Sequence, residues 1–169
     1  MIAGVCGLEG RSGHRAGREL LAELYRRETG EPLPPILIRP GGKPGFQNSP
    51  WHFSISHTTR HAFCVLARER VGLDAEELDR RIAPGLAKKI LSPEELLRYA
   101  QAEDKPRALI TFWVLKEASA KLTGEGIRRY PNHTDFSLTD SRLFEAEGCI
   151  AALFSQSGRL LLPEELHVI

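Results

Sequence analysis

Hydrophobic positions recur with helical spacing in residues 15–29, where three leucines and a tyrosine fall on one side of the predicted helix. Gly30 follows, which is typical of a helix end because glycine readily adopts the left-handed conformation. Beyond it, short apolar runs are separated by prolines, glycines and polar turns, so the pattern changes from helix to strand. These runs predict strands at Ile36–Ile38, Trp51–Ser56, Ala62–Ala67 and Val71–Leu73, the second and third forming a hairpin around Thr58–Arg60.

Two helix signals open the second half of the chain. Ser92-Pro93-Glu94-Glu95 combines a capping serine, a proline in the first turn and a glutamate three residues after the cap, which predicts a helix from Pro93. This helix should end before Pro106, and another should begin just after it. The last third predicts strands at 135–140, 149–155 and 165–169. This order of elements indicates an α+β fold with mostly antiparallel pairing.

The helix after Pro106 is apolar around almost its whole circumference. Its apolar side chains are Leu109, Ile110, Phe112, Trp113, Val114, Leu115, Ala118, Ala120 and Leu122. Helices of this kind are usually buried, yet this one carries Lys116, Glu117 and Lys121, and buried charges need a partner, a metal or an anionic ligand. Because Glu117 and Lys121 stand one turn apart, a simple ion pair between them is the alternative to a binding site.

Composition limits the classes of protein that fit. The 169 residues are 41% hydrophobic, which suggests one domain with a substantial core. A net charge of +1 argues against general nucleic-acid binding but allows a local anion site. Cys6, Cys64 and Cys149 are far apart in the sequence, so neither a disulfide framework nor a zinc site fits and a cytoplasmic location is expected. No run of 18 apolar residues occurs, so no membrane span is expected.

Asp74 and Glu76 directly follow an apolar strand and stand two residues apart. In an extended chain such residues point to the same side. Together with Glu117 they could supply three carboxylates to Mg²⁺, which prefers oxygen ligands and leaves room for phosphate. The alternative for the pair on its own is a solvated acidic turn.

Several cations could meet a phosphate. Lys43 stands in the stiff turn Gly41-Gly42-Lys43-Pro44-Gly45, where it could serve as a fixed point charge. Arg11, His14, Arg15 and Arg18 gather where the first helix begins, and free N–H groups favour anions there. His57 closes a strand beside Ser56. For each of these residues, an ordinary solvated or structural role is the alternative.

Taken in order, the segments GKPGF, FSISHT, VGLDAEE and FWVLKEASAKLTGEG resemble the 4′-phosphopantetheinyl transferases. The motif order is similar to that of the larger class, which activates surfactin-type synthetases. In the short trimeric holo-acyl-carrier-protein synthases, by contrast, the G-x-D segment opens the chain and the S-x-S-H segment closes it. The resemblance implies a mostly antiparallel sheet packed on helices, with pseudo-two-fold halves in one domain 1–169: a reduced N-terminal half at about 1–70 and a motif-bearing half at about 71–169.

The resemblance also implies an activity. The 4′-phosphopantetheine arm of coenzyme A would pass to a serine of an apo acyl or peptidyl carrier protein, releasing 3′,5′-ADP. The implied Mg²⁺ ligands are Asp74, Glu76 and Glu117, and the implied catalytic residues are Glu117 (as the base), Lys121 and His57. The implied coenzyme A contacts are His14, Arg15, Lys43, Ser56, His57 and Lys121. Neither nucleic acid nor a membrane is an expected partner.

Some positions depart from the family pattern. The region before His14 is short for the larger class, Ser54 stands where asparagine is frequent, and Ala75 replaces a branched residue. Arg128 and Arg129 are candidates to meet an acidic carrier helix.

Two other functions compete with transfer. One is a non-catalytic homologue that binds coenzyme A or a carrier protein. The other is a Mg²⁺ nuclease, with Asp74 joined by Glu103, Asp104 and Lys105.

Overall fold

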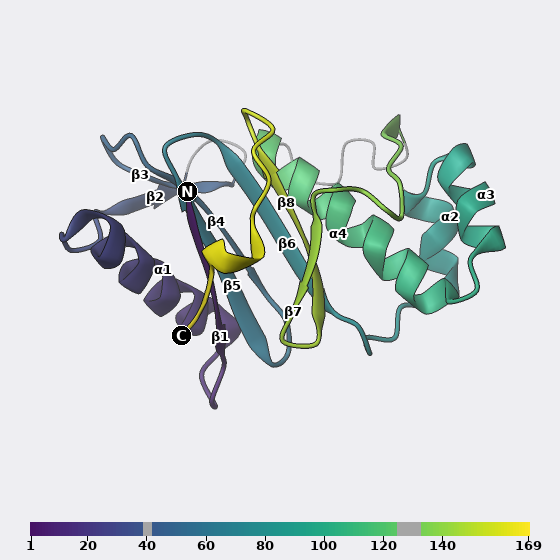
Figure 1. The fold of residues 1–169 in the computed structure, drawn as a ribbon, viewed down its shortest axis with the longest axis horizontal. Coiled ribbons are helices and arrows are strands. Elements are labelled where there is room, and N and C mark those ends of the chain that lie inside the picture. The colour runs from purple at the N-terminus through teal and green to yellow at the C-terminus, as the bar shows by residue number, and fades with distance from the viewer. Residues whose placement is uncertain (39–41, 125–132) are drawn as a thin grey trace.

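A computed structural model describes residues 1–38, 42–124 and 133–169 of the chain. Strands and helices mix along these ranges, as the α+β prediction requires (Figure 1). The elements are β1 (Ile2–Gly7), α1 (Gly13–Thr29), β2 (Ile36–Ile38), β3 (Pro44–Phe46), β4 (His52–His57), β5 (His61–Ala67), β6 (Val71–Glu77), the 3-10 helix Pro84–Leu86, α2 (Ala87–Ile90), α3 (Pro93–Gln101), α4 (Lys105–Thr123), β7 (Leu143–Ala146), β8 (Cys149–Ser155), the 3-10 helix Pro163–Glu165 and β9 (Leu166–Val168).

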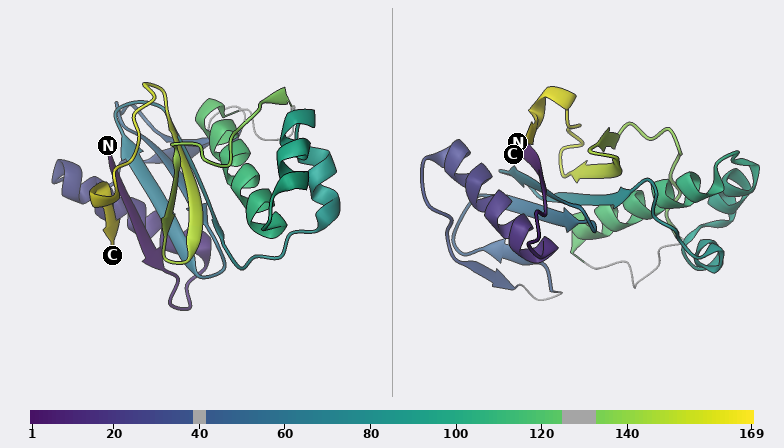
Figure 2. Two further views of the ribbon diagram at one scale, coloured as in Figure 1. Left: turned by 45° about the vertical axis from the view of Figure 1, so that its right-hand side comes forward. Right: turned by 90° about the horizontal axis from the view of Figure 1, so that it is seen from below.

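The strands form two main sheets. The first has the order β4-β5-β1-β9, with β1 antiparallel to β5 and parallel to β9. The second has the order β6-β8-β7 and is antiparallel throughout, while β2 and β3 form a short separate ladder. The prediction of mostly antiparallel pairing is confirmed. Helix α1 packs on the first sheet and α4 on the second, on either side of β4, β5 and β6 (Figures 1 and 2).

The helix ends follow the sequence signals closely. Ser12 caps α1 by accepting a hydrogen bond from the Arg15 N–H, and Gly30 ends the helix with φ 74°. Asp104 caps α4, which begins at Lys105, slightly earlier than predicted. Pro106, the second residue of α4, is tolerated because its missing N–H lies in the first turn, where it would have no helical partner. Among the described helices, none is long and apolar enough to span a bilayer.

The predicted strand at 135–140 is wrong. Residues 135–137 have no regular structure and 138–139 form a turn. The Phe136 N–H donates to Glu95 Oε1 at 2.9 Å, so a side chain supplies the acceptor that a neighbouring strand would have supplied. Strands β1, β3 and β7 were not predicted. The predicted strand Val71–Leu73 extends to Glu77, which places the acidic pair inside a strand rather than after one.

Lys116 shows how the buried charges of α4 are accommodated. Its Nζ lies 2.7 Å from Glu95 Oε2, and the two side chains are 2% and 0% exposed. Lys116 also donates to the Thr134 carbonyl oxygen at 2.8 Å. The expectation that this charge has a partner is confirmed, and the partner is structural: it ties α4 to the capped start of α3.

Candidate active site

Gly72 allows β6 to approach α4 closely. A Cβ at this position would lie 2.1 Å from the Ala118 carbonyl oxygen and 2.4 Å from the Leu122 nitrogen, so only glycine fits between the two main chains. The contact sets Asp74, two residues further along β6, beside the last turns of α4.

Asp74 is held by groups from two other elements. Lys121 Nζ lies 2.7 Å from Asp74 Oδ1 and also donates to the Ile55 carbonyl oxygen of β4 at 3.3 Å. The Ser56 hydroxyl donates to the same Asp74 oxygen at 2.8 Å and accepts from the Ala75 N–H at 3.2 Å. In the described part of the chain, the buried atom Asp74 Oδ2 has no hydrogen-bond partner. A buried carboxylate oxygen without a partner is unfavourable, so it is a natural ligand for a cation.

Two serines of β4 take the place of strand pairing at the junction of the sheets. Strands β4 and β6 belong to different sheets, and the Leu73 N–H donates to the Ser54 hydroxyl at 3.0 Å as the Ala75 N–H does to Ser56. The side chains of FSISH thus carry the hydrogen bonds that join the N-terminal and C-terminal parts of the site. Ser54, noted only as a departure from the family pattern, has this role.

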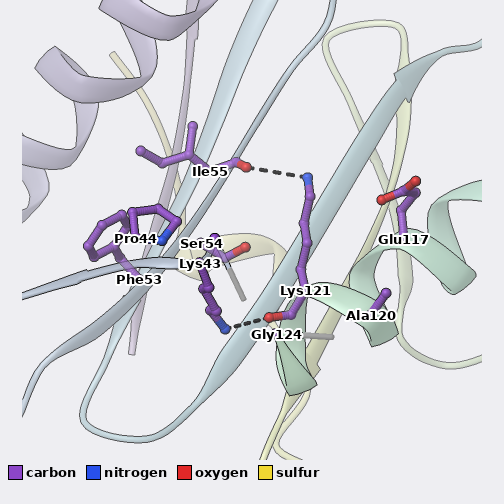
Figure 3. A pocket seen from close by; sticks show the side chains of 10 residues that line it. Lys43, Pro44, Phe53, Ser54, Ile55, Glu117, Ala120, Lys121 and Gly124 are labelled. Carbon is purple, nitrogen blue, oxygen red and sulfur yellow. Dashed lines mark hydrogen bonds between the residues drawn. The ribbon is translucent and has the colours of Figure 1, made fainter. Parts of the chain in front are cut away.

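Glu117 lies one turn before Lys121, and both residues line one cavity (Figure 3). Burial raises the pKa of Glu117, the negative charge of Asp74 raises it further, and the Lys121 ammonium offsets part of this effect. Lys121 pairs with Asp74, and among the described residues the alternative i,i+4 ion pair with Glu117 is not formed.

A cavity of about 250 Å³ opens where α4, β4 and the start of β3 meet. Its lining residues are Gly42, Lys43, Pro44, Phe53, Ser54, Ile55, Glu117, Ala120, Lys121 and Gly124 (Figure 3). Glu117 and Lys121 lie on one side, with Pro44 and Phe53 on the other. Such a cavity suits a ligand that presents an anion or a bound cation to α4 and a flat or apolar part to the opposite wall.

The predicted metal ligands are only partly brought together. Asp74 and Glu117 are close enough for one charge to perturb the other, whereas Glu76 forms an ion pair with Arg80. Across the described ranges, no group of three or more His, Cys, Asp or Glu side chains is arranged to hold a metal ion. Asp74 Oδ2 and Glu117 are suitable oxygen donors, whereas one oxygen of Glu76 is held by Arg80.

His57 lies at the exposed end of β4, against the first turn of α1. A Cβ at Gly13 would lie 2.5 Å from His57 Cγ, so the missing side chain makes room for the imidazole ring. His57 therefore lies against Gly13, at the start of the helix that also carries His14 and Arg15.

The basic cluster at the start of α1 has its own counter-ion. Glu19 accepts from Arg15 Nε at 2.8 Å and from Arg11 Nη1 at 2.8 Å. These hydrogen bonds, with Arg15 contributing most, lower the pKa of Glu19. An anion binding here would compete with Glu19 for two guanidinium groups.

Lys43 lies in the cavity wall but directs its ammonium to the main chain. It donates to the Val71 carbonyl oxygen at 3.0 Å, to that of Leu122 at 3.4 Å and to that of Lys121. Gly41, in the same predicted turn, lies outside the described residues, as do Arg128 and Arg129.

The nuclease alternative receives no support from the geometry. Asp104 and Lys105 lie at the opposite end of α4 from Lys121, roughly 24 Å away at 1.5 Å per residue. They therefore do not meet Asp74. Sequence reasoning also missed Gly72 and Gly13. An isolated glycine in a strand, such as Gly72, is a known signal of close backbone approach, whereas Gly13 begins a helix.

Comparison with known proteins places the chain in a family. The model described as "4'-phosphopantetheinyl transferase superfamily" matches residues 70–156, and the chain belongs to this superfamily. It is 35% identical over 88 residues to the 4'-phosphopantetheinyl transferase HetI of Nostoc sp. (50% of this chain, 37% of the relative). It is 30% identical over 115 residues to psf-1 of Bacillus pumilus (65% and 47%), also a 4'-phosphopantetheinyl transferase by name. With a holo-[acyl-carrier-protein] synthase of Sodalis glossinidius the identity is 31% over 111 residues (57% and 88%). The chain thus spans less than half the length of the first two relatives.

Proposed function

We propose that the protein transfers the 4′-phosphopantetheine arm of coenzyme A to a serine hydroxyl of an apo carrier protein and releases 3′,5′-ADP. The observation that carries this proposal is that Glu117 and Lys121 line one cavity, while Asp74, which pairs with Lys121 and raises the pKa of Glu117, keeps one buried oxygen without a partner in the described part of the chain. Membership of the superfamily and the names of the relatives support it.

Glu117 is the proposed base. The reaction forms a bond between the serine oxygen and the β-phosphorus of coenzyme A and breaks the bond from that phosphorus to the oxygen that leaves with 3′,5′-ADP. The serine proton needs an acceptor, and a carboxylate with a raised pKa holds a proton more strongly than an ordinary glutamate does. Burial beside Asp74 supplies that property without a second base.

Lys121 is the proposed contact to the diphosphate. Its ammonium is fixed by Asp74 and the Ile55 carbonyl, so it is already oriented before a ligand arrives. His57, His14 and Arg15 are proposed to hold the adenosine end and its 3′-phosphate, with Ser56 between the two regions.

Mg²⁺ is the proposed metal. The ligands we propose are Asp74, Glu76 and Glu117, of which the buried Asp74 Oδ2 is the clearest candidate. Mg²⁺ would supply positive charge to the diphosphate as negative charge builds up there. The chain's own part is to hold carboxylate oxygens at the cavity and to exchange the Glu76–Arg80 ion pair for the metal.

We further propose that the chain is of the larger class, with pseudo-two-fold halves, and that it acts in the cytoplasm. The order of its motifs supports this assignment: the segment FSISHT comes before VGLDAEE.

The test is a mass measurement on the acceptor. The protein is incubated with coenzyme A, Mg²⁺ and a panel of apo carrier proteins, and each carrier is weighed afterwards. Transfer predicts a gain equal to one phosphopantetheine on a single serine. With the variant Glu117→Gln the carrier should gain mass far more slowly than with the wild type, while Glu94→Gln, at an exposed position of α3, should not slow the gain. If coenzyme A binds but no carrier gains mass, the chain is a binding homologue and the proposal is wrong.

A further inference from the structure

Lys43 contacts three backbone carbonyl groups from two elements. One belongs to Val71 at the start of β6, and the other two belong to Lys121 and Leu122 in the last turn of α4. An ammonium group has three N–H donors, so it can bond to several carbonyl oxygens at once. The contacts span 28 to 79 positions of sequence separation, which makes Lys43 a long-range link rather than a local turn contact.

The two helical carbonyls lie in the last turn of α4. The last four C=O groups of a helix lack intrahelical donors. Gly124, at φ 81°, donates its N–H to the Ala120 carbonyl, and the Thr123 hydroxyl donates to the same oxygen at 3.1 Å. The Lys121 and Leu122 carbonyls come next, and Lys43 reaches both. A cation at this end also opposes the negative pole of the helix.

Lys121 is therefore held at two points. Lys43 binds its carbonyl oxygen, while its own ammonium binds the Ile55 carbonyl oxygen (Figure 3). The same ammonium also binds Asp74. Between these points β6 and α4 touch at Gly72. Lys43 also donates to the Val71 carbonyl oxygen at the start of β6. Movement of the last turn of α4 would therefore displace both the carbonyl contact and the ammonium contacts of Lys121.

We propose that Lys43 is a positioning residue: it caps the end of α4, fastens it to β6 and thereby holds Lys121 on Asp74. This inference rests on the proposed function, and it assigns Lys43 a role other than direct contact with coenzyme A. The two roles make different predictions, because a residue acting through Lys121 loses its effect when Lys121 is already gone, whereas a separate ligand contact does not.

The first experiment needs no activity. Amide hydrogen exchange is compared between the wild-type chain and Lys43→Met, which keeps the length of the side chain but removes the charge. We expect roughly tenfold faster exchange in peptides covering 115–124 and unchanged exchange in peptides covering 16–25 of α1. The control Lys89→Met, at an exposed position of α2, should change neither. Unchanged exchange at 115–124 in Lys43→Met would overturn the proposal.

The second experiment is a double-mutant cycle on transfer, using Lys43→Met, Lys121→Met and both together. Lys43→Met alone should lower kcat/KM roughly tenfold. The double variant should match Lys121→Met within about twofold. If the two losses multiply instead, Lys43 contacts the substrate independently and the positioning role is wrong.

Lys43→Arg provides the rescue, and it also covers the case in which Lys43→Met does not fold. A guanidinium retains the charge and several donors, so it should restore most of the protection at 115–124. Failure of that variant to protect the segment counts against capping. If the wild-type chain transfers nothing to any carrier, the proposed function fails on its own, and the exchange comparison still decides the role of Lys43.

Discussion

Glu117 combines a raised pKa with a position beside Asp74, so its ionised form is disfavoured in the fold. A group of this kind contributes stability at pH values below its unfolded pKa, and that contribution is lost as the pH rises through its folded pKa. At neutral pH the carboxylate therefore works against folding. A glutamate at position 117 is understandable if its charge serves the reaction rather than the structure.

The variant Glu117→Gln tests this separation of roles. We expect transfer to fall roughly 10²-fold or more, because the proposed base is removed, while the melting temperature at pH 7 stays equal or rises. Steady-state transfer and thermal melts are the measurements. Near-normal transfer would exclude Glu117 as the base, and a clear loss of stability would mean that its charge supports the fold.

At the level of single residues, the sequence predicted which charges matter but not what each one does. Lys116, Glu117 and Lys121 stood out because they interrupt an apolar helix. Lys116 has a buried structural partner, Glu95, which is 21 positions away in the sequence. No local pattern identifies such a partner. For the same reason, Lys121 could be matched with Glu117 by spacing, while its actual partner Asp74 depends on the contact between β6 and α4.

The β6–α4 contact depends on the absence of a side chain at Gly72. In Gly72→Ala the new methyl group would meet the Ala118 carbonyl, a main-chain atom that cannot rotate away. We expect a loss of about 1–3 kcal/mol or more in the free energy of unfolding, together with weaker transfer because Asp74 and Lys121 move apart. Urea denaturation measures the first effect. Gly85→Ala is the control, since a Cβ at that position would have no heavy atom within 4 Å beyond its chain neighbours; equal stability of the two variants would contradict the tight contact.

A bidentate pair steadies the turn before β7. Arg142 donates to both oxygens of Asp140, at 2.8 and 2.6 Å, and lowers the pKa of Asp140. A lowered folded pKa gives stability that is present above the unfolded pKa and lost as the pH falls through the folded pKa.

Asp140→Asn should therefore unfold at lower urea concentration than wild type at pH 7. The difference should be about 1 kcal/mol or less, since Arg142 is 35% exposed. It should shrink progressively as the pH drops below about 4. If the difference in the free energy of unfolding stays constant down to about pH 2–3, the geometry of the Asp140 side chain rather than its charge is responsible.

At the level of elements, the sequence succeeded where signals are local. The capping box, the glycine end of α1 and the apolar run of β8 were predicted correctly. Strand β3 was missed because its proline and glycine have low strand propensity, and its pairing with β2 supplies what propensity does not. The segment 135–140 alternates like a strand, but Glu95 captures its backbone. Tertiary partners overrode local pattern in both cases.

For the molecule as a whole, the site lies between a hydrophobic cluster around α1 and another around α4, and a third cluster joins the two main sheets. The part around α1 supplies His57, Ser56 and the Ile55 carbonyl, whereas the part around α4 supplies Asp74, Glu117 and Lys121. Residues from Ile55 to Lys121 in the sequence meet there. Periodicity and composition do not predict such contacts, whereas the resemblance to a family gives an expected arrangement of motifs as well as their residues.

A ligand that bridges the two parts should stabilise the folded chain. Ligand present at a hundred times its dissociation constant adds about 2.7 kcal/mol if it binds only the folded state. We therefore expect coenzyme A with Mg²⁺ to raise the melting temperature by about 5–10 °C.

Coenzyme A with a chelator should give a smaller rise, since the diphosphate would then meet Asp74 and Glu117 without a neutralising ion. In Asp74→Asn the increment from Mg²⁺ should disappear while part of the metal-free rise remains. If chelation leaves the full rise intact in the wild-type chain, the unpartnered Asp74 oxygen is not a metal ligand, and coenzyme A binding must rest on the lysine and the basic groups of α1 alone.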